Sequence, residues 1–182
     1  MTDLIQIPHG RVFTAADLEG MPDDGNRYEI IDGALIVTPS PAVPHQRVVG
    51  NMHLVLRAGV PDDHEVMLAR LDVTVSDLTV LQPDLLVATR EALAGRKMVG
   101  LPVLAIEVLS PSTRLIDLNL KKAALAEAGV VHYWVIDPER PSLTAWRLAQ
   151  DEFTEVGSAT GAQVFTVTDP FPVHVSPAAL LH

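Results

Sequence analysis

Two apolar segments, residues 81–88 and 101–109, each carry one acidic residue inside a predicted strand. The acids are Asp84 and Glu107, and their neighbours are mostly Leu, Val, Ile and Ala. Short apolar runs of this kind are typical of strands buried in a sheet. An unpaired carboxylate costs several kcal/mol in that position, so each acid needs a cation, a metal ion or a raised pKa. One divalent cation shared by both acids meets this need.

A helix predicted over residues 114–129 follows the second acidic strand, and Gly129 suits its C-terminal end. Asp117 and Lys121 are four residues apart and share one face of this helix. Because the helix starts just beyond the strand that carries Glu107, it can bring the Lys121 amine near both acids. Two acids that hold a cation and a lysine that stabilises a charged phosphate form a constellation suited to phosphodiester hydrolysis.

Composition limits the fold and the compartment. The chain has 182 residues, of which 48% are hydrophobic, and this is enough for a single folded domain spanning residues 1–182. It has no cysteine, which excludes disulfides, thiolate metal sites and thiol nucleophiles. We see no basic leader followed by an apolar run, and no segment approaches the ~20 apolar residues of a membrane span. The sequence therefore predicts a cytoplasmic protein without a membrane segment.

Charge argues against a broad nucleic-acid surface, because the formal net charge is −10. Non-specific DNA affinity depends largely on neutralising phosphates, which an acidic surface opposes. Any contact with DNA must use a local basic patch. Three candidates share the loop between the two acidic strands, and others flank the helix that follows or lie elsewhere: Arg90, Arg96, Lys97, Arg114, Lys122 and Arg70.

The remaining patterns predict an α/β (α+β) fold with a mixed central β-sheet flanked by helices. Residues 1–25 form an N-terminal arm with a short capped helix, and Asp32-Gly33 predicts a hairpin between two strands. A helix over residues 44–58 packs on the sheet. The other predicted elements are a hairpin pairing residues 65–75 with 79–88, a buried strand at 130–136, and C-terminal strands within 143–168 that extend the sheet or cover an edge.

The order of these motifs resembles the PD-(D/E)XK restriction-endonuclease-like superfamily, and within it the Uma-type family of bacterial endonucleases. The resemblance covers residues 27–138, and the last strands are an extension. The motifs that carry it are YEIIDG at 28–33, SP at 40–41, HQ at 45–46, QPDL at 82–85, IEVLSPST at 106–113, Asp117 with Lys121, and AGV at 128–130 leading to YWVIDP at 133–138.

The resemblance implies a restriction-endonuclease-like domain that cleaves DNA with Mg²⁺ or Mn²⁺. It assigns catalysis to Asp84, Glu107 and Lys121, with the metal on the two acids. The superfamily expects a lysine two residues after the second acid, where this chain has Leu109, whereas the Uma-type family takes its lysine from the next helix. Leu125 and His132 stand where the family tends to have tyrosine and glutamate.

Four further residues are candidates for accessory roles, each with a structural alternative. Glu29 approaches the metal or is an exposed hairpin residue. His45 acts at the site or packs locally at a helix start. Gln82 positions a water molecule or satisfies a loop carbonyl. Asp117 orients the lysine or favours the first helical turn through the helix dipole.

Two functions remain open from the sequence. The first is a metal-dependent deoxyribonuclease, acting on DNA. The second is a binding module on the same scaffold, which recognises a protein or a nucleic acid without cutting it. Trp146, Phe153 and Phe165 in the last strands form the seam of a homodimer or cap the domain's own core.

Overall fold

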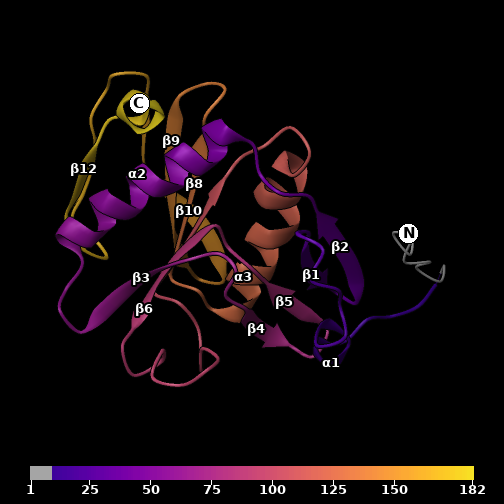
Figure 1. Cartoon of the computed structure of the whole chain (residues 1–182). Helices are drawn as coiled ribbons and strands as arrows, with labels where there is room; N and C mark the ends of the chain where they lie inside the picture. The colour runs from indigo at the N-terminus through magenta and orange to yellow at the C-terminus, as the bar shows by residue number, and fades with distance from the viewer. Residues whose placement is uncertain (1–9) are drawn as a thin grey trace.

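The computed structural model describes residues 10–182 (Figure 1), so the first nine residues of the predicted arm lie outside the described range. None of the helices within that range is both long enough and apolar enough to cross a membrane. The elements follow in the order α1 (Ala15–Leu18), β1 (Arg27–Ile31), β2 (Ala34–Thr38), α2 (Val43–Gly59), β3 (His64–Leu68), β4 (Val73–Ser76), β5 (Thr79–Leu81), β6 (Leu85–Thr89), β7 (Leu104–Val108), η1 (Ile116–Lys121), α3 (Lys122–Ala128), β8 (His132–Asp137), β9 (Ser142–Ala149), β10 (Glu152–Thr160), β11 (Phe165–Val167), β12 (Val173–Val175) and η2 (Pro177–Leu181).

The N-terminal elements form as predicted. Asp32 and Gly33 both adopt positive φ angles, 50° and 77°, which a two-residue type I′ turn requires, and β1 and β2 pair antiparallel on either side. Ahead of the hairpin, the Thr14 and Asp17 side chains form a reciprocal capping box at the start of α1.

A six-stranded sheet runs in the order β10-β9-β8-β7-β6-β3. β6 and β7 are antiparallel, whereas β7 and β8 are parallel. A parallel pair needs a crossover connection, and η1 and α3 supply it. The helix that carries Asp117 and Lys121 therefore begins shortly after β7 and lies against the same sheet.

The predicted hairpin of residues 65–75 and 79–88 is only partly right. Leu68 pairs with Leu85 and Val73 with Leu81, but these two halves belong to different sheets. β4 and β5 join the N-terminal hairpin in a four-stranded sheet of order β2-β1-β5-β4. Pro83, which has no backbone N–H to donate to a ladder, lies where the chain passes from one sheet to the other. This break brings β1 close to the start of β6.

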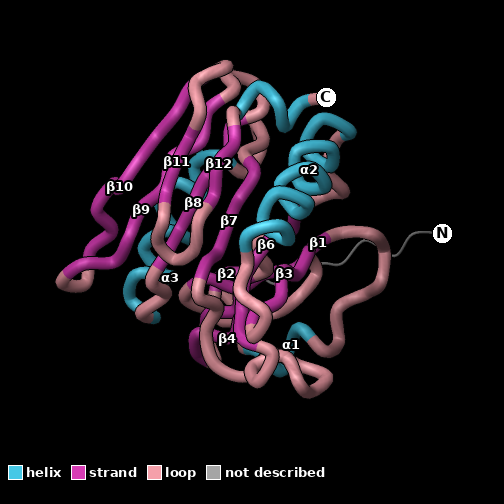
Figure 2. Tube along the Cα trace, turned by 90° about the vertical axis from the view of Figure 1, so that its left-hand side faces the viewer, coloured by secondary structure: helices cyan, strands magenta, loops and turns pink. Residues whose placement is uncertain are grey.

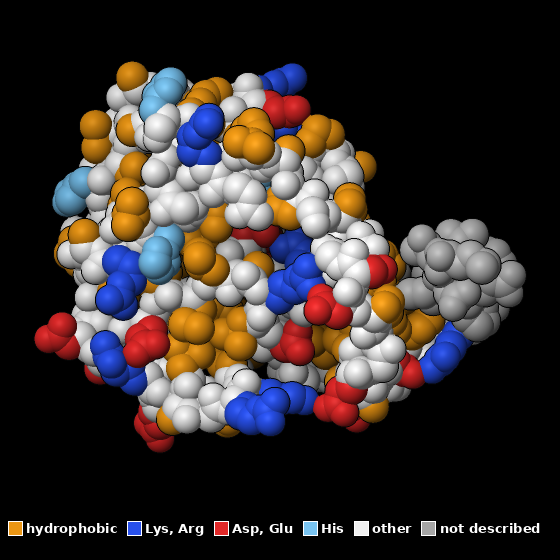
Figure 3. Space-filling model, viewed as in Figure 1, with side chains coloured by type: hydrophobic (Ala, Val, Ile, Leu, Met, Phe, Trp, Pro, Cys, Tyr) orange, Lys and Arg blue, Asp and Glu red, His pale blue; other side chains and the backbone are white. Residues whose placement is uncertain are grey.

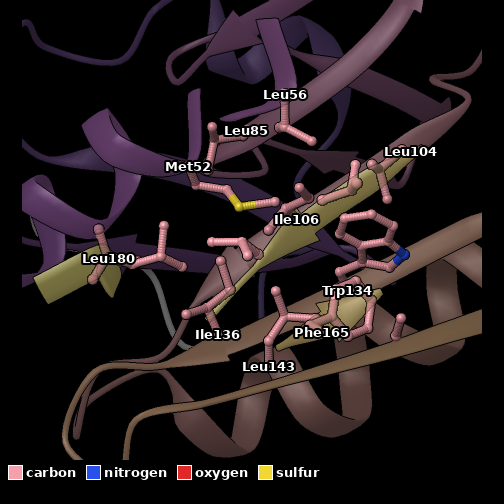
Figure 4. Close-up of a cluster of buried hydrophobic side chains, with 14 of the residues drawn as sticks. Met52, Leu56, Leu85, Leu104, Ile106, Trp134, Ile136, Leu143, Phe165 and Leu180 are labelled. Carbon is pink, nitrogen blue, oxygen red and sulfur yellow. The ribbon is translucent and has the colours of Figure 1, made fainter. Parts of the chain in front are cut away.

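Helix α2 covers one face of the six-stranded sheet. Met52 and Leu56 pack in a core with Leu85, Ile106 and Trp134 (Figure 4). Successive side chains along a strand point to opposite faces, so the neighbour of Ile106 on β7, Glu107, points away from α2. The acid therefore faces the side of the sheet that α2 leaves uncovered.

The opposite face is covered by α3, and Figure 2 shows α2 and α3 on different sides of the sheet. Leu125 of α3 packs with Ala105, Tyr133 and Val135 in a second core. Gly129 adopts a left-handed φ of 91° and ends the helix, as predicted. Glu107 lies in the same row of side chains as Ala105, beneath the helical crossover.

Of the two roles that the sequence left open for the last strands, extension of the sheet is confirmed for β9 and β10. β9 and β10 extend the six-stranded sheet, while β11 and β12 form a separate two-stranded ribbon. Phe165 of β11 is buried, with its ring 5.3 Å from that of Trp134 in an edge-to-face contact. On the other face, Trp146 and Phe153 pack against Tyr133, with ring centroids 6.1 and 5.8 Å away. All three aromatic side chains thus contribute to the chain's own core.

Replacing either of two glycines in α2 by alanine should have opposite effects on stability. A Cβ added at Gly59 would lie 2.5 Å from the Pro172 carbonyl oxygen, whereas one added at exposed Gly50 meets nothing within 4 Å. We expect Gly59→Ala to lower the free energy of unfolding by about 1–3 kcal/mol through overpacking. Gly50→Ala should raise it by up to about 1 kcal/mol through helix propensity. Urea denaturation measures both, and a Gly59→Ala protein as stable as Gly50→Ala would contradict the observed close approach.

Candidate active site

Asp84 and Glu107 lie beside each other on neighbouring strands. Leu85 pairs with Ile106 across β6 and β7, so Asp84, which directly precedes β6, stands next to Glu107. The Val108 backbone N–H donates to Asp84 Oδ2 over 2.9 Å, and the Asp84 N–H points at Glu107 Oε2 over 3.4 Å. Both side chains are buried, with exposures of 4% and 0%. The strand pairing alone therefore brings the two carboxyl groups together.

Lys121 reaches this pair from the helical crossover. Its Nζ lies 2.9 Å from Glu107 Oε1, 2.9 Å from Glu29 Oε1 and 3.4 Å from Asp117 Oδ1. The lysine is only 1% exposed, unlike most lysines on a helix. It pairs with the acid on β7 and not with Asp84. Lys121 is thus the central cation of a buried acidic cluster.

The segment that carries Lys121 is a π-helix, where the sequence predicted a regular α-helix. The wider turn of a π-helix disrupts the regular backbone ladder, and such segments are common at functional sites. Here the Tyr133 hydroxyl donates to the Asp117 carbonyl oxygen over 2.8 Å. A buried side chain from β8 thus bonds the backbone of the segment that positions Lys121. Thr113, just before the helix, is also buried.

Arg27 and His45 contact the two carboxylate oxygens of Asp84. Arg27 Nη1 donates to Asp84 Oδ1 over 2.8 Å, and Arg27 Nε lies 3.3 Å from Glu29 Oε2. His45 Nε2, from the first turn of α2, lies 3.0 Å from Asp84 Oδ2. Sequence reasoning missed Arg27. A signal was present, because strand alternation places residues 27 and 29 on one face of β1.

A cavity of about 580 Å³ opens onto this cluster. Its walls come from the segments 38–46 and 109–113, and it is also lined by Arg27, Arg70 and Asp84. Glu107 and Lys121 do not line it, because they are buried behind Asp84. A ligand in the cavity therefore meets Asp84, Arg27 and His45 first.

The accessory candidates divide into those inside and outside the cluster. Glu29 is fully buried and pairs with Lys121, so it is not an exposed hairpin residue. Asp117 is 1% exposed and lies beside the same lysine. Gln82 uses its backbone N–H to bond Glu29 Oε1 over 2.7 Å, but its side-chain amide donates to Asp72. Its side chain therefore makes no hydrogen bond to Asp84, Glu107 or Lys121.

Of the six basic candidates, Arg70 lines the cavity and the other five do not. The loop holding Arg90, Arg96 and Lys97 follows β6, so it lies at the opposite end of that strand from Asp84. Arg90 pairs with Glu65 and Lys97 with Glu19. At the helix start, Arg114 pairs with Asp137 over 2.7 Å, and farther along, Lys122 lies over the Trp146 ring. In Figure 3 basic side chains are interspersed with acidic ones across the face shown.

The environment moves the pKa values of the two central acids in opposite directions. Burial opposes ionisation of Asp84, but the hydrogen bond from His45 and the Arg27 charge outweigh it and hold the Asp84 pKa well below its usual range. Burial raises the pKa of Glu107 well above its usual range, and the Asp84 charge adds to this against the opposing Lys121 ammonium. Asp84 therefore ionises more readily than an ordinary carboxyl group, and Glu107 ionises less readily.

Burial and neighbouring charges also shift the pKa values of Lys121, Asp117 and Tyr133. Burial alone would lower the pKa of Lys121, but the charges of Glu107 and Glu29 outweigh it and raise that pKa above its usual value. Burial raises the pKa of Asp117, against the opposing charge of Lys121. Burial and the surrounding acids also raise the pKa of Tyr133, so its hydroxyl is a neutral donor. Lys121 is therefore a fixed positive charge.

The donor chemistry of the cluster fits a hard divalent cation. Among the described residues, four carboxyl groups, those of Glu29, Asp84, Glu107 and Asp117, share two permanent cations, Arg27 and Lys121. Carboxylate oxygens are the ligands that Mg²⁺ and Mn²⁺ prefer. In the described part of the chain, however, no three acidic or histidine side chains are already arranged as a ligand set. A cation bound to Asp84 would have to take an oxygen that now contacts Arg27 or His45.

Comparisons with known proteins agree with this architecture. A crystal structure described as a "putative nuclease belonging to DUF820 from Anabaena variabilis ATCC 29413" matches with a TM-score of 0.77 and 20% sequence identity. The match covers 93% of this chain and 97% of that one, and it confirms the predicted fold class. No curated protein matches the chain.

Fold and family comparison together define a nuclease-like protein of the restriction-endonuclease type. The family described as "Uma2: Putative restriction endonuclease" matches residues 15–180. The chain belongs to the Uma2 family, which confirms the resemblance seen in its motifs.

The opposite pKa shifts predict opposite effects of two amide substitutions in metal-free protein. A folded pKa raised above the ordinary 4.5 means that Glu107 favours folding at low pH, and that this contribution is lost as the pH rises through the folded pKa. Glu107→Gln should therefore gain stability relative to wild type as the pH rises from 5 to 8.

Asp84→Asn is the matched control, and it should change stability in the opposite direction. The lowered pKa of Asp84 gives stability that is present above the ordinary 3.8 and lost only as the pH falls toward the folded value. This variant should be destabilised at both pH 5 and pH 8. Denaturant titration with a chelator present measures each curve, and a Glu107→Gln protein that loses stability between pH 5 and pH 8 would refute the charge balance described above.

Proposed function

We propose that this protein is a metal-dependent endonuclease that hydrolyses phosphodiester bonds in DNA. The observation that carries the proposal is the charge imbalance beneath the cavity, where four buried carboxyl groups share two permanent cations within the described residues. Carboxyl groups that outnumber their cationic partners offer hard oxygen donors to a divalent cation, which takes the place of any proton they hold. Restriction-endonuclease-like proteins generally use such ions, and Mg²⁺ or Mn²⁺ is the cofactor we propose.

Asp84 and Glu107 would hold the ion, together with a backbone carbonyl next to Glu107. A bound ion would lower the pKa of a coordinated water molecule and polarise a phosphate oxygen. Asp84 is suited to this role because its lowered pKa keeps it anionic. Glu107 has a raised pKa, so its proton leaves when a cation takes its place. Cation binding at this site is therefore coupled to proton release.

Lys121 acts as a cation and not as a general base. The charges of Glu107 and Glu29 raise its pKa, so the amine keeps its proton at neutral pH. Its ammonium donates to Glu107 over 2.9 Å. From this place it would stabilise the negative charge that develops on the phosphate, or hold the attacking water by a hydrogen bond. Glu29 and Asp117 support this role by holding the lysine.

DNA contact in this proposal is confined to the rim of the cavity. Arg27 and Arg70 line the cavity, whereas the whole chain carries a net charge of −10. The basic loop with Arg90, Arg96 and Lys97 lies at the other end of β6, away from the proposed site. Affinity that rests on so few phosphate contacts falls less steeply with salt than that of a broadly basic protein.

Plasmid cleavage tests the proposal. With Mg²⁺ or Mn²⁺, wild type should convert supercoiled plasmid to nicked and linear forms. Glu107→Gln should lower the rate at least about 100-fold, because a metal ligand is lost. The control is Glu127→Gln, which makes the same amide substitution at an exposed position of α3 and should cut like wild type. Absence of cutting by wild type, or equal cutting by Glu107→Gln, would leave the non-catalytic binding module as the better account.

We also propose that the protein acts in the cytoplasm as a homodimer, since cutting both strands of a duplex uses two sites. The aromatic residues first considered for the seam are packed on the chain's own core. β10 is an edge strand of the six-stranded sheet and exposes Val156, so it is the better candidate. Light scattering should give twice the chain mass of 19.6 kDa, and Val156→Lys should reduce it to one chain mass. A monomeric wild type would exclude the dimer.

A further inference from the structure

Arg27 occupies a place between two acids of the cluster. Its Nη1 donates to Asp84 Oδ1 over 2.8 Å and to the Gln82 carbonyl oxygen over 3.0 Å. Its Nε lies 3.3 Å from Glu29 Oε2, yet neither atom has a hydrogen-bond partner. The side chain is 13% exposed and lies in the cavity wall. One side-chain hydrogen bond and electrostatic attraction therefore hold the guanidinium against these acids.

The oxygen that Arg27 holds is the one a cation needs. Asp84 Oδ2 is already bonded to the Val108 N–H and contacts His45, which leaves Oδ1 as the oxygen engaged by Arg27 alone. A divalent cation on Oδ1 would stand within a few ångströms of the guanidinium. Two like charges at that separation repel each other strongly in a buried site. The arginine and the metal ion cannot both remain at this oxygen.

We propose that Arg27 is a built-in counter-cation of the metal-free site, and that a divalent cation binds by displacing it from Asp84. The inference rests on the metal site proposed above and adds what sets its affinity. Glu29, whose Oε2 has no other partner, keeps the displaced guanidinium in the cavity wall. There its planar fork of donors suits a phosphate oxygen pair of the substrate. The metal-free protein thus stays folded with its acids partly neutralised.

Calorimetric titration with Mn²⁺ tests the displacement directly. Arg27→Gln removes the competing charge, so it should bind Mn²⁺ at least about tenfold more tightly than wild type. The control is Arg47→Gln, which removes a charge from an exposed arginine of α2 that bonds the Leu181 carbonyl and contacts none of the acids. It should bind Mn²⁺ within about threefold of wild type. Asp84→Asn should abolish binding in either background.

Thermal unfolding supplies a second readout. In chelator, Arg27→Gln should melt below wild type, because its acids lose a counter-charge, and Mn²⁺ should raise its melting temperature more than that of wild type. If Arg27→Gln does not fold, Arg27→Lys replaces it. A lysine amine cannot hold Asp84 and Glu29 together, so this variant should bind Mn²⁺ at least about threefold more tightly than wild type.

The outcomes separate this inference from the proposed function. Tighter Mn²⁺ binding by the Arg27 variant supports the displacement. Equal or weaker binding by that variant, with Asp84 still required, overturns the displacement and leaves the metal site intact. If neither wild type nor the Arg27 variant binds Mn²⁺, both the displacement and the metal site are overturned.

Discussion

The fold buries several carboxyl groups between its two larger sheets and the helical crossover, and each of them needs a positively charged or hydrogen-bonding partner. Removing one partner from a buried ion pair typically costs about 3–5 kcal/mol, so every acid here needs a neighbour. Separate elements supply them: β1 brings Arg27, α2 brings His45, and η1 brings Lys121. The packing of the N-terminal hairpin, the first turn of α2 and the helical crossover around the start of β6 follows from this need. An apolar cluster of the same volume would often be as stable or more stable, so stability alone does not account for the buried acids.

Local irregularities gather at the same place. The crossover widens into a π-helix at Lys121, the extended chain breaks at Pro83 between β5 and β6, and the Asp84 carboxylate accepts a backbone N–H from the neighbouring strand. Each departs from the regular element that the sequence pattern favours. Departures of this kind are expected where function and local preference conflict. Tyr133 connects the π-helix to the outer strands. Its hydroxyl donates to a backbone carbonyl of the π-helix, and its ring packs against Trp146 and Phe153.

Sequence patterns were sufficient where a feature is local. The Asp32-Gly33 turn, the helix end at Gly129 and the apolar surroundings of Glu107 follow from backbone preference and strand alternation. The spacing of Asp117 and Lys121 also placed both on one helix face. The contact between Arg27 and Asp84 could not be predicted, because it joins residues 57 positions apart through the packing of two sheets. For the same reason the division of the second hairpin between those sheets was missed, although Pro83 marked the break.

Asp84 and Glu107, as we propose, form one divalent-cation site with Lys121 at its back. Anomalous diffraction from crystals soaked in Mn²⁺ tests it most directly, since it locates the ion without reference to activity. The account predicts one strong peak at coordination distance, about 2.0–2.4 Å, from carboxylate oxygens of both acids, with the Lys121 amine still beside Glu107 and Arg27 moved off Asp84. A peak elsewhere on the chain, or soaked crystals in which Asp84 keeps its Arg27 contact and no ion lies near Glu107, would contradict it.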